Sequence, residues 1–306
     1  MRIVFMGSAA LACPSLERLL TSALNVVGVV TQPDRPKGRD LRPAACPVRA
    51  HIGQREIPIL TPINVNSPES IAQLRSWRPD LIVVVAYGQI LKPALLAIPA
   101  RGCLNVHASL LPRYRGAAPI QWAIARGETQ TGVTTMFMDA GLDTGDIIAQ
   151  RMEPISAEDT AATLHTRLAC LGAELLMSTL EAVRRGQVPR RPQDPAAASY
   201  APKLRKVDGR LDWQLAAVDL ANRVRGFNPW PGCYFERGGS AIKGLRARVE
   251  PGEGRPGEVL AARGAGPLIQ TGTQALRLLE LQPAGRAAMS GAAFLCGHRF
   301  SEGEQL

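Results

Sequence analysis

The chain has 306 residues, 46% of them hydrophobic and 20% charged, and its formal net charge is +10. This composition excludes an intrinsically disordered protein, because enough apolar surface is present to bury a sizeable core, and the length favours two domains. Six widely spaced cysteines, without a Cys-x-x-Cys pair or a histidine at ligand spacing, give no sequence support for a zinc site and indicate reduced thiols.

No segment predicts a membrane span or a secretion signal. No apolar run reaches the roughly 18 residues that a membrane span needs. The N-terminus has a single charge, Arg2, and Gly7 and Ser8 interrupt the apolar stretch that follows, which matches a signal peptide poorly. We therefore expect a cytoplasmic protein that does not associate with a membrane.

The first two thirds of the chain alternate short apolar runs with helical patterns. Strands are expected at residues 3–6, 25–31, 81–86, 104–106 and 132–138, and helices after Gly7 through Leu24, at 68–77 and at 119–126. Such alternation predicts a parallel sheet covered by helices, with ligands bound outside the carboxyl ends of the strands. The first turn, residues 7–13, lacks G-x-G-x-x-G, so a dinucleotide site is not predicted.

Two segments hold most of the positive charge. Residues 34–49 carry five Lys or Arg against two acids, a net +3, and residues 184–206 carry seven against one, a net +6. Concentrated charge of this kind can follow a phosphate backbone. Either segment, taken alone, could equally be a solvated surface run.

Asn105 and His107 are the most informative pair in the chain. If a strand ends near Val106, its alternation points both side chains to one face. An amide and an imidazole that converge can donate hydrogen bonds to a carbonyl oxygen that gains negative charge in a transition state. The Pro- and Gly-rich stretch 109–119 that follows predicts a loop of fixed shape. The alternative is a structural histidine and a turn-capping asparagine.

Asp143 lies in the segment Gly-Leu-Asp-Thr-Gly-Asp at 141–146. A carboxylate near the imidazole could orient it and accept a proton from an attacking amine. The chemistry predicted is acyl or one-carbon transfer to nitrogen. The residue types of this segment are also common in turns, so Asp143 could instead be a turn residue. Asp139 or Asp146 would then supply the carboxylate.

The last third predicts a second domain. A helix is expected at residues 160–185, an extended basic linker at 186–202 and another helix at 211–225. Short apolar runs separated by Gly and Pro then follow at 241–249, 257–261, 267–271 and 275–281. Closely spaced short strands of this kind predict a small β-barrel, although the pattern alone fits any small β module.

At these motifs the chain resembles the 10-formyltetrahydrofolate-dependent formyltransferases, and among them those that act on methionyl initiator tRNA. The resemblance spans residues 1–7, 31–36, 105–112, 141–146, 200–204, 208–213 and 224–232. It implies a Rossmann-like α/β catalytic domain at 1–186, a basic linker at 187–205 and an OB-like β-barrel tRNA-binding domain at 206–306. It also implies formyl transfer from 10-formyltetrahydrofolate to the α-amine of methionyl initiator tRNA, in translation initiation, by a monomer without a metal.

The resemblance assigns residues to three groups. Asn105, His107 and Asp143 match the family's catalytic residues. Ser109, Leu110, Leu111 and Pro112 match its folate contacts. The tRNA contacts implied are Arg35, Lys37, Arg39 and Arg42 in the basic loop, and Arg190, Arg191, Lys203, Arg205 and Lys206 in the linker.

The chain departs from the family pattern in two places. The family usually has Gly-Thr-Pro and an aromatic residue where this chain has Gly7-Ser8-Ala9, and further Gly and Lys where it has Asp40, Leu41 and Arg42. Three alternatives to the tRNA activity stay open: formyl transfer to a small amine, hydrolysis of the formyl group, and tRNA binding without catalysis.

Overall fold

The computed structural model describes residues 1–37 and 42–306, with the backbone alone for 35–37, 42 and 43. The chain divides into two compact units. Unit 1 comprises residues 1–116, 131–154 and 165–200, and unit 2 comprises 117–130, 155–164 and 201–306. Among the described residues, no helix combines the length and the apolar character that crossing a membrane requires.

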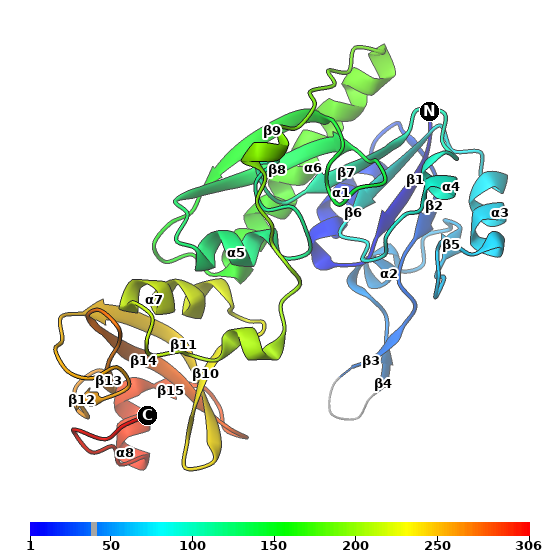
Figure 1. Cartoon of the computed structure of the whole chain (residues 1–306). Helices are drawn as coiled ribbons and strands as arrows, with labels where there is room; N and C mark the ends of the chain where they lie inside the picture. Colours follow the sequence, from blue (N-terminus) through cyan, green and yellow to red (C-terminus); the bar gives the residue numbers. More distant parts are fainter. Residues whose placement is uncertain (38–41) are drawn as a thin grey trace. The chain divides into compact units, whose positions relative to one another are not determined.

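Unit 1 is built on a seven-stranded sheet with the order β5-β2-β1-β6-β7-β8-β9 (Figure 1). The strands are β1 Arg2–Gly7, β2 Asn25–Val30, β5 Ile59–Leu60, β6 Leu81–Val85, β7 Cys103–His107, β8 Gln130–Phe137 and β9 Ile147–Pro154. All five residues of β6 and of β7 are buried, as expected for strands covered on both faces. The core of this unit includes Val4, Met6, Ile82 and Leu95.

The sheet is mixed. The five strands from β5 to β7 pair in parallel, as predicted, but β8 pairs antiparallel to β7. Strand direction depends on the route of the connection between strands, which an apolar pattern does not record. An antiparallel edge on an otherwise parallel sheet is a common arrangement.

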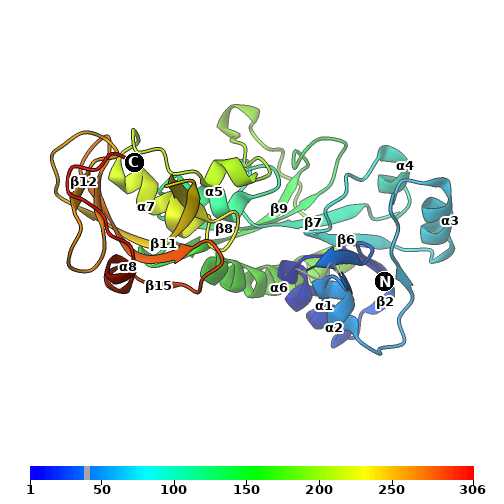
Figure 2. The ribbon, with the colours of Figure 1, turned by 90° about the horizontal axis from the view of Figure 1, so that it is seen from below.

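The helices of unit 1 begin mostly at prolines. They are η1 Ala10–Ala12, α1 Cys13–Leu20, α2 Pro47–Ile52, α3 Pro68–Ser76, α4 Pro93–Leu96 and η2 Pro195–Ala197, together with most of α6 Ala161–Arg185. Figure 2 shows α1 and α6 on the same side of the sheet. The hairpin of β3 Arg35–Lys37 and β4 Arg42–Ala44 is a separate two-stranded sheet.

The first helix ends earlier than predicted. The hydroxyls of Thr21 and Ser22 donate to the carbonyls of Glu17 and Leu19, both at 2.8 Å, and satisfy the helix end at Leu20 instead of Leu24. The atypical first turn still needs its glycine. A Cβ on Gly7 would approach Ala12 Cβ at 2.8 Å and the carbonyl oxygen of Val85 at 3.0 Å.

Unit 2 holds an antiparallel sheet with the order β10-β11-β14-β13-β12, and β15 pairs with β14. The strands are β10 Cys233–Arg237, β11 Ser240–Glu250, β12 Val259–Ala261, β13 Leu268–Gln270, β14 Ala275–Pro283 and β15 Met289–Ser290. The four strands predicted from the sequence coincide with β11 to β14. The closed, OB-like form stays a prediction.

The helices of unit 2 pack on one another and on this sheet. They are α5 Pro119–Ala125, η3 Lys206–Gly209, α7 Ala217–Gly226 and α8 Gly291–Gly297. Trp122 on α5 meets Phe227 edge to face, with ring centroids 5.4 Å apart. The helix predicted from residue 211 begins only at Ala217, because the Asp212 carboxylate accepts from the backbone N–H of Gln214 and forms a turn there.

Candidate active site

The end of β7 places Asn105 and His107 on one face of the sheet. Both are buried, with 9% and 6% of their surface exposed. The Asn105 amide nitrogen donates to Asp143 Oδ1 at 3.4 Å, and His107 Nδ1 lies 3.7 Å from Asp143 Oδ2. The structure thus brings together the three residues that the sequence singled out, from positions up to 38 residues apart.

The imidazole of His107 is held from its other side. Its Nε2 lies 2.9 Å from the carbonyl oxygen of Tyr114. A carbonyl oxygen can only accept, so Nε2 carries a proton and donates in this arrangement. Nδ1 therefore faces the Asp143 carboxylate and can donate to it only when the ring is doubly protonated.

The carboxylate of Asp143 is fixed by a strained turn. Its φ of 53° is in the left-handed region, and its Oδ2 accepts from the backbone N–H of Gly116 at 2.8 Å. The two alternative carboxylates are engaged elsewhere. Asp139 Oδ1 accepts from the Gly141 N–H and the Thr144 hydroxyl, and Asp146 lies 3.9 Å from Arg190.

The loop after β7 is held internally at the residues predicted to contact folate. The Ser109 hydroxyl donates to the carbonyl of Arg113 at 2.7 Å, and the Thr134 hydroxyl donates to the carbonyl of Ser109 at 2.6 Å. Ser109 and Leu111 are buried, whereas Leu110 and Pro112 are partly exposed. A bound ring could therefore reach the side chains of Leu110 and Pro112, while Ser109 and Leu111 shape the loop.

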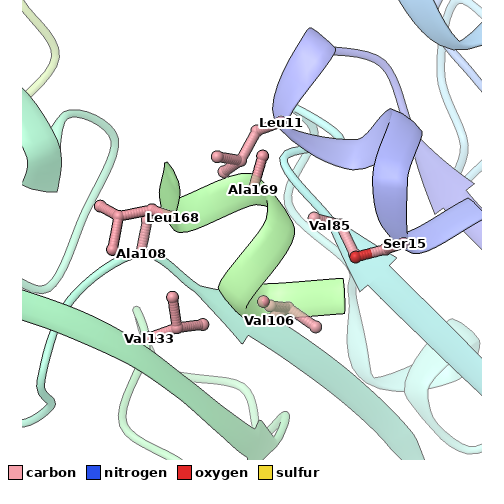
Figure 3. Close-up of a pocket in the computed structure, with 9 residues that line it drawn as sticks. Leu11, Ser15, Val85, Val106, Ala108, Val133, Leu168 and Ala169 are labelled. Carbon is pink, nitrogen blue, oxygen red and sulfur yellow. The ribbon is translucent and has the colours of Figure 1, made fainter. Parts of the chain in front are cut away.

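A small cavity of about 10 Å³ lies behind the same strand (Figure 3). Val106 and Ala108 line it, and these residues alternate with Asn105 and His107 along the chain, so it opens on the opposite face of the sheet. Leu11 and Leu168 close it from the helix side. Its volume is about that of one water and is too small for a folate.

The structure places the predicted RNA contacts in different settings. Arg39 lies outside the described residues. Arg35, Lys37 and Arg42 lie in the β3–β4 hairpin, where Lys37 pairs with Arg42 along the backbone.

The linker residues of the same set are all exposed. The Arg190 guanidinium lies 4.0 Å from the ring centroid of Phe137. Arg191 exchanges two backbone hydrogen bonds with Ile147. Arg205 pairs with Asp208 at 3.5 Å. Lys203 and Lys206 complete the set.

Two residues of this neighbourhood were missed by sequence reasoning. Arg115, 4% exposed, donates from its side chain to Gln193, and the Gln193 amide in turn donates to the carbonyls of Asp143 and Gly145. The position of Arg115 in the fixed-shape loop was a usable signal. Gln193 gave none, because it stands in an aperiodic stretch rich in Pro, Arg and Ala.

Comparisons with known proteins match both ends of the chain to one family. A family model described as "Formyl transferase" matches residues 1–180, and one described as "Formyl transferase, C-terminal domain" matches 203–299. A protein of Geobacter sulfurreducens named methionyl-tRNA formyltransferase is 48% identical over 306 residues, covering all of this chain and 96% of that protein. One of Pelotomaculum thermopropionicum with the same name is 46% identical, covering 99% and 97%.

Solved structures share the fold at low identity. HypX from Aquifex aeolicus in complex with tetrahydrofolic acid superposes with a TM-score of 0.62 at 22% identity, over 96% of this chain and 47% of that one. An N-formyltransferase from Helicobacter canadensis, in complex with folinic acid and dTDP-3-aminofucose, has a TM-score of 0.67 at 18% identity, over 90% and 98%.

Proposed function

The chain belongs to the formyl transferase family, and on that basis we propose that it transfers a formyl group from 10-formyltetrahydrofolate to the α-amine of methionyl initiator tRNA. The observation that carries this proposal is the whole-length likeness to proteins named methionyl-tRNA formyltransferase. The product, formylmethionyl-tRNA, serves translation initiation.

The cluster at the end of β7 supplies the groups that this reaction needs. The neutral amine attacks the formyl carbon, and the formyl oxygen becomes an oxyanion. Asn105 and the doubly protonated form of His107, which carries a proton on Nδ1 as well as on Nε2, donate hydrogen bonds to that oxygen. His107 then gives its Nδ1 proton to the departing folate nitrogen. Asp143 orients the imidazole and receives the amine proton through a water. Donors that are already in place stabilise the transition state without reorganisation.

The loop 109–112 is the proposed folate contact. It combines partly exposed apolar side chains at Leu110 and Pro112 with a backbone held by Ser109 and Thr134. Apolar walls with a few fixed polar groups suit a flat heterocycle. We assign the tRNA to the basic loop, the linker and residues 206–306, as the resemblance implies, with Arg39 as the strongest single candidate.

A cytoplasmic location and a monomeric state are parts of the same proposal. The six cysteines are free thiols in the structure, which suits a reducing compartment. Cell fractionation tests the location, and sedimentation of the purified protein, alone and with tRNA, tests the monomer.

A formyl-transfer assay with parallel acceptors tests the function. The purified protein is incubated with 10-formyltetrahydrofolate and methionyl initiator tRNA, methionyl elongator tRNA or glycinamide ribonucleotide. We expect formylation of the initiator alone. Transfer only to the small amine would overturn the tRNA assignment, and loss of the formyl group to water without transfer would indicate a hydrolase. Binding of tRNA without either reaction would indicate a protein that no longer catalyses.

A further inference from the structure

The segment that follows α6 is attached to the loops of the candidate active site. Residues 191–199, which we call the strap, belong to unit 1. At one end Arg191 pairs with Ile147 through backbone hydrogen bonds of 2.8 and 3.0 Å. At the other end the Ser199 hydroxyl accepts from the N–H of Tyr114 at 2.9 Å, and the Ser199 carbonyl accepts from the N–H of Arg115 at 2.8 Å.

Gln193 lies inside the strap, and both the nitrogen and the oxygen of its side-chain amide form hydrogen bonds. Its Nε2 donates to the carbonyl oxygens of Asp143 and Gly145, both at 2.8 Å. Its Oε1 accepts from Arg115 Nε at 3.1 Å and from Arg115 Nη2 at 2.7 Å. The guanidinium is buried, so it polarises the amide and strengthens both donated bonds.

These bonds restrain Asp143, whose backbone has a φ of 53°. A left-handed φ at a residue other than glycine is strained and persists only where the surroundings hold it. Gln193 holds the backbone of Asp143, while the Gly116 N–H holds its carboxylate. A Cβ on Gly145 would lie 1.9 Å from the carbonyl oxygen of Phe137, so the turn also packs tightly against β8.

We propose that Gln193 and Arg115 are positioning residues that set the location of the Asp143 carboxylate relative to His107 and Asn105. This inference rests on the proposed function, because it assumes that Asp143 acts in formyl transfer. Neither side chain needs to touch a substrate. A loosened turn displaces the carboxylate, and a shift of about 1 Å at a reacting group can cost up to about a hundredfold in rate.

Gln193→Glu separates positioning from simple attachment of the strap. The carboxylate still accepts from Arg115, but it presents an oxygen where Nε2 donated to two carbonyls. We expect kcat for formyl transfer to fall by about tenfold or more, with KM for tRNA and for folate within about twofold of the unmodified protein. Arg115→Lys, which loses the paired donors but keeps the charge, should lower kcat by less and is a second variant if Gln193→Glu folds poorly.

A double-mutant cycle distinguishes action through Asp143 from a purely structural role of Gln193. If Gln193 acts through Asp143, Gln193→Glu should lower kcat no further in an Asp143→Ala background, whereas a purely structural role predicts multiplicative losses. Two controls in unit 1 accompany it. Gln73→Glu makes the same chemical change at an exposed position of α3, and Leu180→Ala removes a buried side chain of α6.

The outcomes separate the two proposals. Unchanged kcat in Gln193→Glu and Arg115→Lys, multiplicative losses, or an equal loss of kcat in a Leu180→Ala protein of matched melting temperature would overturn the positioning role. Absence of formyl transfer by the unmodified protein would instead overturn the proposed function.

Discussion

The candidate active site and the basic segment at residues 184–206 hold their polar side chains in opposite ways. Asn105, His107 and Asp143 are joined to one another or to nearby backbone, and the first two are buried. The basic side chains are exposed, and those of Arg184, Arg185 and Arg205 pair with neighbouring acids, as where Glu181 pairs with Arg184 at 3.0 Å. A site of the first kind depends on positions, whereas a site of the second kind depends on charge that salt can screen.

The largest effects should follow from removing a member of the buried cluster. Asn105→Ala, His107→Ala and Asp143→Ala should each lower turnover by about a hundredfold or more, because each removes a group that we propose acts in the transition state. Binding of tRNA should change little. Single-turnover formyl transfer and filter binding measure the two quantities. Turnover close to normal in any of the three variants removes that residue from its proposed role.

The basic loop should show the reverse pattern. Arg39→Ala should raise KM for initiator tRNA by about tenfold, leave kcat at saturating tRNA unchanged, and make the salt dependence of binding shallower by about one phosphate contact. Arg75→Ala, at an exposed position of α3, is the matched control. A change confined to kcat would place Arg39 in the chemistry instead of in RNA binding.

The shared face of Asn105 and His107 was predictable from the sequence because strand alternation is local. Asn105 and His107 share a face whatever the rest of the fold does. The choice of Asp143 over Asp139 was not predictable, since it depends on a left-handed residue and on the Gly116 N–H, 27 residues away. Gln193 contacts the Asp143 carbonyl across 50 residues from a segment without periodicity, and no local pattern encodes such a contact.

The fold shows the same difference between features that local sequence encodes and features that it does not. Apolar runs located the strands closely, as with residues 241–249 and β11 Ser240–Glu250. They gave no direction for β8, which turned out antiparallel to β7. They also missed β10 Cys233–Arg237, whose mixed apolar and charged residues gave no apolar run.

Within the basic segment, a cation that pairs with an acid should contribute less to tRNA affinity than a cation for which no such pair is seen among the described residues. Hydrogen bonds from Arg184 and Arg185 lower the pKa of Glu181, so this acid stays charged and offsets part of the local surplus. Lys206→Ala should therefore weaken tRNA binding by about threefold at low salt, and Arg184→Ala by less. Binding measured at two salt concentrations tests the order. A larger loss with Arg184→Ala would mean that paired cations also contact the RNA.

The smallest effect should be a pH-dependent difference between two ion-pair networks. In unit 2, hydrogen bonds from Arg277 and then Arg248 lower the pKa of Glu250, and this carboxylate is 19% exposed. A carboxyl whose pKa is lowered on folding stabilises the protein above its unfolded pKa, and this contribution is lost as pH falls through the folded value. Glu250→Gln should thus lower the free energy of unfolding by about 1 kcal/mol at pH 7, with the difference vanishing in acid.

Glu181→Gln is the counterpart at the exposed end of α6. Its partners Arg184 and Arg185 keep 65% of their side-chain surface in solvent, where water and salt screen the attraction. Chemical denaturation of both variants between pH 3 and 8 compares the two networks, because this range extends from below the ordinary pKa of a glutamate carboxyl to well above it. An equal loss of stability in both would mean that exposure does not separate the two networks, and that the exposed cations at Glu181 are held as firmly as those at Glu250.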